Sequence, residues 1–227
     1  MPNPKPTSTP GAQPAPRLRA DAERNRRQLV DAARTVFAER GLDAPLDEIA
    51  RRAGIGNATL YRRFPHRRDL IAAVFVDTLR RVVEASRQAL ADPDPWSAFA
   101  GHLVFLGELQ ASNRALADLL TTSVGGKGEL AELRTVAFDN LNQLIDNAKA
   151  GGDLREDFGH EDVVLILMAG AGLVQRTADA APTAWRRHLS YVLDGLRAPG
   201  HTPAAPSPGH RRVIAAMHAL AKSHGYT

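Results

Sequence analysis

The 227-residue chain contains no cysteine, and aromatic residues make up only 5% of it. Without cysteine neither a disulfide framework nor a thiolate metal site can form, so we expect a protein of the reducing cytoplasm. The longest apolar run covers residues 163–174, well short of the roughly 18 residues that indicate a transmembrane helix. The proline-rich N-terminus lacks the apolar segment of a secretory signal. These absences exclude disulfide-rich and membrane-spanning proteins and leave an ordinary globular composition.

Positive charge is concentrated towards the N-terminus. Residues 1–20 carry three basic residues and no acid, and residues 21–75 carry 11 arginines against 8 acids, whereas residues 76–197 carry 12 basic and 17 acidic residues. A basic N-terminal third on an acidic body favours a polyanionic partner for that third. A solvated arginine-rich surface is the alternative interpretation of the same charges.

The spacing of apolar residues predicts an all-α chain. Two proline-rich stretches, residues 1–16 and 198–209, contain too little apolar surface to fold. We therefore expect an arm at residues 1–20, a small helical domain at 21–66, a larger helical body at 67–197, and a linker with a short helix at 198–227. The predicted helices cover residues 24–40, 46–53, 56–64, 67–90, 96–111, 114–124, 129–150, 162–178, 183–197 and 211–223.

A helix-turn-helix pattern stands at residues 49–70, which read IARRAGIGNATLYRRFPHRRDL. Two short helices meet at a three-residue turn, and Gly54 can take the positive φ that ends the first helix sharply. Leu60 and Phe64 lie four apart and are expected to face the interior. Residues 57–59 and 61–63 are then left on or near the exposed side of the second helix.

The exposed residue types suit DNA. Asparagine can pair with adenine through two hydrogen bonds, and threonine or alanine can contact a thymine methyl group. Tyrosine and arginine can donate hydrogen bonds to phosphate oxygens. Residues 51–68 contain six arginines and no acid, so binding to DNA would depend strongly on salt. A structural helical hairpin is the other interpretation that composition allows.

Residues 42–70 (LDAPLDEIARRAGIGNATLYRRFPHRRDL) resemble the DNA-binding domain of TetR-family transcriptional regulators. The Ile-Ala-x-x-Ala-Gly and Thr-Leu-Tyr-x-x-Phe blocks carry the resemblance, which is dense over residues 24–75. It implies an all-α homodimer with an N-terminal three-helix DNA-binding domain and a C-terminal helical domain for ligand binding and dimerisation. The resemblance also implies a repressor that a small-molecule ligand releases from a palindromic operator.

Carried over position by position, the resemblance implies a DNA-binding role for seven residues. Asn57 and Ala58 would face bases, and Thr59 would lie at the edge between bases and backbone. Tyr61, Arg63 and Arg67 would contact phosphates, and Arg62 would contact a guanine or a phosphate. The full predicted set is Asn57, Ala58, Thr59, Tyr61, Arg62, Arg63 and Arg67.

Three positions depart from the family pattern. Gly56 stands where serine is frequent, so the recognition helix lacks a side-chain cap. Pro45 and Leu46 replace a threonine pair that caps the preceding helix, and Asp47 would repel phosphate. These departures weaken the expectation of DNA contacts from the start of that helix.

The body is expected to provide a dimer interface and a ligand site. The apolar run at residues 163–174 must be covered on both sides, and a stripe of Trp185, Leu189, Val192, Leu193 and Leu196 follows it. We therefore predict a homodimer through residues 162–178 and 183–197, with an ordinary monomer core as the alternative. Candidate ligand-lining residues, for each of which a place in the plain core is the favoured alternative, are Phe99, His102, Leu103, Leu106, Phe138, Leu141 and Met168.

Motifs for catalysis are missing. The chain has no glycine-rich phosphate loop, no His-Glu-x-x-His and no nucleophile elbow. Residues 160–162 (HED) are interpreted as a polar helix cap, and His210, His218 and His224 are too widely spaced for a metal site. We expect no catalytic activity, no metal and no cofactor. The alternatives are an enzyme or carrier on a helical scaffold, and a helical ligand-binding protein without DNA binding.

Overall fold

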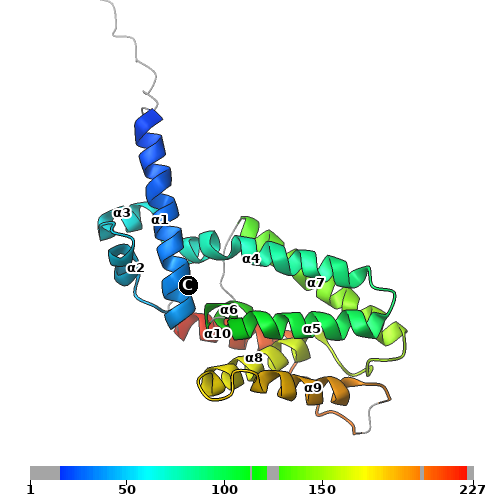
Figure 1. Cartoon of the computed structure of the whole chain (residues 1–227). Helices are drawn as coiled ribbons and strands as arrows, with labels where there is room; N and C mark the ends of the chain where they lie inside the picture. Colours follow the sequence, from blue (N-terminus) through cyan, green and yellow to red (C-terminus); the bar gives the residue numbers. More distant parts are fainter. Residues whose placement is uncertain (1–15, 113, 122–127, 200–201, 224–227) are drawn as a thin grey trace, which may run out of the picture.

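The computed structural model describes residues 16–112, 114–121, 128–199 and 202–223, and within these residues the chain forms helices and no strand. Figure 1 shows α1–α3 at one end of the molecule and the remaining helices in a larger bundle. The all-α prediction is confirmed. The helices are α1 (Pro16–Arg40), α2 (Leu46–Arg52), α3 (Asn57–Arg63), α4 (Arg67–Leu90), α5 (Pro95–Ser112), α6 (Arg114–Thr121), α7 (Glu129–Ala150), α8 (His160–Thr177), α9 (Ala184–Leu196) and α10 (His210–Ser223).

Helix α1 begins at Pro16, eight residues before the predicted start at residue 24 and inside the segment expected to be an arm. Proline is favoured at the first position of a helix, because its missing N–H would have no partner there. The residues that follow are mostly alanine, arginine, aspartate and glutamate, without a helix breaker before Gly41. The rest of the predicted arm, residues 1–15, lies outside the described residues.

The small domain has its own apolar centre. Leu29, Phe37, Ile49 and Leu60, from the first three helices, are each fully buried. Gly54 has φ 67°, as the turn between α2 and α3 requires. Burial of this centre fixes the orientation of α3 and thereby decides which of its side chains face solvent.

In the larger body, α5 packs against α4, α6, α7, α8 and α9. Helices α4 and α7 lie along one another (Figure 1). They are joined by a hydrogen bond from Asn140 Nδ2 to the buried Ser86 Oγ at 2.8 Å. None of the described helices is both long enough and apolar enough to cross a membrane.

The appended helix α10 packs against α8. Its predicted apolar positions separate into two sets: Val213 and Ala221 are buried, whereas Leu220 is 37% exposed. Ala221 belongs to the main apolar core. The helix is therefore part of the folded body, although a proline-rich linker precedes it.

Candidate DNA-binding surface and ligand cavity

Helix α3 presents a polar, acid-free face to solvent. Leu60 and the following Phe64 are buried, as the sequence predicted, and they hold the helix against the small domain. Five predicted DNA-binding side chains on this helix are exposed and a sixth, Thr59, is half-buried. The exposed ones are Asn57, Ala58, Tyr61, Arg62 and Arg63.

The N-terminal ends of the two short helices, α2 and α3, lack side-chain caps. Gly56 is the N-cap of α3 and Pro45 is the N-cap of α2, and neither makes a side-chain cap hydrogen bond.

The seventh predicted DNA-binding residue has a different environment. Arg67, at the start of α4, donates from Nη1 to the carbonyl oxygens of Leu42 at 2.8 Å and Ala44 at 2.6 Å. Asp118 of α6 accepts a hydrogen bond from Leu42 N at 2.9 Å. The loop before α2 is thus tied to both α4 and α6, so a movement of either helix reaches the DNA-binding domain directly.

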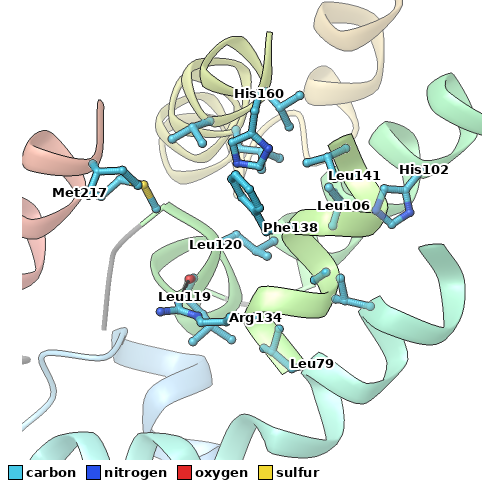
Figure 2. A pocket seen from close by; sticks show the side chains of 16 residues that line it. Leu79, His102, Leu106, Leu119, Leu120, Arg134, Phe138, Leu141, His160 and Met217 are labelled. Atoms are coloured by element: carbon cyan, nitrogen blue, oxygen red, sulfur yellow. Dashed lines mark hydrogen bonds between the residues drawn. The ribbon is translucent and has the colours of Figure 1, made fainter. Parts of the chain in front are cut away.

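A cavity of about 240 Å³ opens inside the body, close to α6. Figure 2 shows side chains from several helices converging on it, with Phe138 among them. Thirteen of its sixteen lining residues are apolar. The lining comprises Leu79, Val82, His102, Leu106, Leu119, Leu120, Arg134, Ala137, Phe138, Leu141, His160, Val163, Val164, Leu167, Ile214 and Met217.

Two histidines in this lining, the buried His102 and the half-buried His160, have an unpaired atom. Nδ1 of His102 and Nδ1 of His160 are both buried without a hydrogen-bond partner. Burial lowers the pKa of His102 to about 4 and also lowers the pKa of His160, with a smaller opposing effect of Glu161. Both imidazoles are therefore neutral at physiological pH.

Arg134 is the only charged side chain of the lining. Its Nη2 donates to the Leu119 carbonyl at 2.6 Å, which ties α7 to α6. Burial lowers the pKa of Arg134 to about 10, so the guanidinium keeps its charge at neutral pH.

The burial of His102 predicts acid sensitivity. The unfolded chain titrates this group near 6.5 and the folded chain near 4, so the unfolded state binds more protons between those values and stability falls as the pH falls. Through this group the parent should lose roughly 3 kcal/mol of its free energy of unfolding between pH 7 and pH 4. Replacing His102 with phenylalanine should abolish that part of the loss. Urea unfolding across this range measures it. His188→Phe, at an exposed histidine, is the control, and parallel profiles for parent and His102→Phe would contradict the assignment.

Two family profiles match the chain. The profile described as bacterial regulatory proteins of the tetR family matches residues 29–74, and the C-terminal domain of SbtR-like transcriptional regulators matches residues 94–198. Together they take in the α3 surface and most of the cavity. The chain belongs to the TetR family. Regulators of this family bind DNA operators and small-molecule ligands and act as dimers.

Several named regulators and several proteins of known structure are similar to this TetR-family chain. The transcriptional repressor LfrR of Mycolicibacterium smegmatis is 40% identical over 75 residues, and the match covers 33% of this chain and 37% of LfrR. A TetR regulator from Streptomyces coelicolor is 34% identical, with 76% and 98% of the two chains covered and a TM-score of 0.47. FadR of Bacillus subtilis, solved with stearoyl-CoA, is 17% identical, with 74% and 96% covered and a TM-score of 0.55, which shows the shared fold.

The cavity of this TetR-family chain includes four of the seven ligand-lining residues predicted from sequence: His102, Leu106, Phe138 and Leu141. The other three do not line it. Phe99 is fully buried and packs against Phe158. Leu103 faces a smaller cleft between α5, α8 and α9, and Met168 lies half-buried on α8.

Sequence reasoning missed the other polar groups of the cavity. His160 was interpreted as part of a helix cap, yet it is the first residue of α8 and its ring packs on Phe138 at 4.2 Å between centroids. Arg134 lies four residues before Phe138 and seven before Leu141, on the same face of α7. That periodicity was the available signal for Arg134. No signal pointed to Ile214 and Met217 of α10.

The predicted dimer helices of this TetR-family chain expose apolar surface. Leu165 of α8 is 41% exposed and Tyr191 of α9 is 61% exposed, whereas Trp185 and Leu189 are buried within the chain itself. The seam expected at Leu189 therefore belongs to the body's own core, where its methyl groups lie close to Gly107. We call Leu165, Ala169 and Tyr191, with the small residues Gly172 and Gly195 nearby in sequence, the α8–α9 face.

Proposed function

We propose that this TetR-family chain is a transcriptional regulator that binds a palindromic operator as a homodimer and leaves it when a small molecule enters the cavity. The exposed, acid-free face of α3 carries the proposal. Asn57 and Ala58 contact bases, and Tyr61, Arg62 and Arg63 contact phosphates, with Thr59 at the edge between them. The protein acts in the cytoplasm, where its DNA is.

The arrangement of charge around α3 supports this role. Nη2 of Arg63 lies 3.5 Å from Oε2 of Glu23 on α1. Because both side chains are exposed, a DNA phosphate can replace Glu23 as the partner of Arg63 at little cost in free energy. Arg67 has a positioning role, because its hydrogen bonds hold the loop before α2.

The dimer forms through the α8–α9 face, within residues 162–178 and 183–197. Exposed apolar side chains on two adjacent helices bury themselves against a second copy, and glycine and alanine between them allow close approach. A two-fold axis gives each dimer two copies of α3. Two half-sites one helical turn apart require centres about 34–36 Å apart.

Ligand control follows from the junction between the domains. The cavity is lined by residues of α4 and α6, and these two helices hold the loop before α2 through Arg67 and Asp118. In the dimer, DNA binding requires one particular spacing of the two α3 helices. A ligand that binds more tightly to a state with another spacing weakens DNA binding by the ratio of its affinities for the two states. By linkage, operator DNA weakens the ligand by the same factor.

The test is a salt-titrated binding assay with DNA from upstream of the protein's own gene. Arg62→Ala should weaken binding to every sequence about fivefold to tenfold and lower the salt slope by about 1. Asn57→Ala should also relax base preference at one or two positions. Arg87→Ala, at an exposed arginine of α4, is the control. Parental DNA binding by a folded Arg62→Ala and Asn57→Ala protein would contradict the site.

A further inference from the structure

The wall of the cavity is almost entirely apolar. Thirteen of its sixteen lining residues are apolar, and none of the sixteen is acidic. The two histidines add no charge, because burial lowers the pKa of each imidazole. A positively charged ligand would therefore leave water without meeting a carboxylate, at a large cost in free energy.

The one cation of the lining is part of the wall's own structure. Nη2 of Arg134 donates to the Leu119 carbonyl at 2.6 Å, so the guanidinium is engaged in joining α7 to α6. Figure 2 shows Arg134 beside Leu119 at one side of the lining, whereas Phe138 lies near its centre. A carboxylate in the cavity would exchange its water for a mostly apolar wall, so an uncharged ligand is favoured.

The volume of the cavity sets the size of the ligand. An apolar cavity of about 150 Å³ holds one benzene molecule. The present cavity measures about 240 Å³, about 1.6 times as much. At the same packing it holds roughly nine or ten carbon atoms where the smaller one holds the six of benzene. That is the size of two fused six-membered rings.

Flat side chains in the wall favour a flat ligand. The rings of Phe138 and His160 pack on each other at 4.2 Å between centroids, and both residues line the cavity. Aromatic rings pack well on one another in offset or edge-to-face arrangements. A planar aromatic ligand can therefore extend this pair of rings.

Helix α10 completes the cavity from outside the family profile. Ile214 and Met217 of this helix line the cavity, although the profile of the C-terminal domain ends at residue 198. In Figure 2 the side chain of Met217 stands on one side of the cavity, opposite His102. The length of this methionine thus limits how far a ligand can extend towards α10.

We infer that the cavity binds an uncharged, planar, two-ring aromatic molecule, and that Met217 sets its upper size. The rings pack against Phe138 and the apolar side chains of the lining. This inference rests on the proposed function, because it names the ligand class of the same cavity.

Fluorescence titration of matched probes with the full-length protein tests the inference. Naphthalene should bind at least roughly tenfold more tightly than 2-naphthoate, which has the same rings and a negative charge. Naphthalene should also bind more tightly than phenanthrene, which has a third ring. Phenanthrene has more apolar surface, so hydrophobicity alone predicts the reverse order.

Two pairs of variants locate the probe. Ala137→Phe fills the cavity from α7 and should weaken naphthalene at least roughly tenfold, whereas Ala150→Phe, at the exposed end of the same helix, should bind like the parent. Met217→Ala should enlarge the cavity and make phenanthrene the tighter ligand. Leu220→Ala, on the same helix but outside the lining, should keep the parental order. Thermal unfolding verifies that each variant is folded.

Four results would overturn the inference. These are no saturable binding of naphthalene up to its solubility limit, binding of 2-naphthoate as tight as that of naphthalene, tighter binding of phenanthrene to the parent, and unchanged naphthalene binding by a folded Ala137→Phe protein. An unchanged order of affinities in Met217→Ala would overturn the role of Met217.

Binding to DNA from upstream of the protein's own gene is measured in parallel. Parental DNA binding together with a failed probe series rejects only the ligand class. Tight naphthalene binding by a protein that does not bind DNA, or that keeps its DNA affinity when naphthalene is bound, rejects the proposed function and leaves the ligand class standing.

Discussion

Replacing Leu165 with arginine is expected to turn the dimer into a monomer and to abolish tight operator binding. Leu165 is an exposed leucine on α8. With Val192 and Leu196 of α9 it forms the apolar part of a hollow that Arg155, Asp157 and Asp162 also line. A two-fold interface places two copies of each residue in contact with the partner. The substitution therefore puts two arginines into one apolar seam.

The expected size of this effect follows from charge burial. An unpaired charge in an interface costs about 3–5 kcal/mol, so two charges should raise the dissociation constant of the dimer by at least roughly a thousandfold. A monomer carries only one α3 helix and reads one half-site, so specific binding is lost with the dimer. Sedimentation at micromolar concentration and a gel-shift assay measure the two results.

Leu220→Arg is the matched control for Leu165→Arg. Leu220 is also a partly exposed leucine, at 37%, but it lies on α10 outside the α8–α9 face. The Leu220→Arg protein should remain a dimer that binds DNA like the parent. If Leu165→Arg sediments like the parent, or if the parent is itself a monomer at micromolar concentration, the α8–α9 face is not the interface.

Replacing Ala221 with arginine should detach α10 from the body. Ala221 is fully buried within the main apolar core, so no space exists for the longer charged side chain. Overpacking and burial of an unpaired charge together should cost about 2–4 kcal/mol of stability. The side chains of Arg211 and Arg212 are already exposed, but their backbone is helical in the parent. In the detached helix that backbone can unfold into the protease, so trypsin should cleave there far faster than in the parent.

Ala216→Arg makes the same change at an exposed position of the same helix. It adds an identical charge, so any difference between the two variants comes from burial of Ala221. Urea unfolding and mass spectrometry of the tryptic fragments give the stability and the cleavage site. Equal resistance of the two variants to trypsin would mean that α10 does not depend on Ala221 for its place.

The fold and the exposed face of α3 were largely predictable because they follow from local pattern. The spacing of Leu60 and Phe64 decides which face of α3 is buried, and a glycine at position 54 permits the turn. Each of these signals lies within a few residues of the structure it determines. The start of α1 was missed because proline-rich composition outweighed the helix-forming residues that follow Pro16.

The cavity was less predictable because it depends on packing between distant segments. His102 and Phe138 face the cavity. Phe99 is as apolar as Phe138 and lies on the same helix as His102, yet it packs into the core instead. The choice depends on how α5 is rotated against its neighbours. Leu189 shows the same limit, since an apolar stripe does not reveal whether it packs within its own chain or against a second copy.

The junction between the two domains relies on main-chain atoms of the DNA-binding side. Leu42 offers its N–H and carbonyl, and Ala44 its carbonyl, whereas the side chains that bind them, Arg67 and Asp118, belong to the body. Any residue except proline that fits the packing presents the same main-chain groups. The DNA-binding domain is in this sense an exchangeable module. A homologous domain with a different base preference, joined to this body, would be connected to the cavity through the same three hydrogen bonds to Arg67 and Asp118.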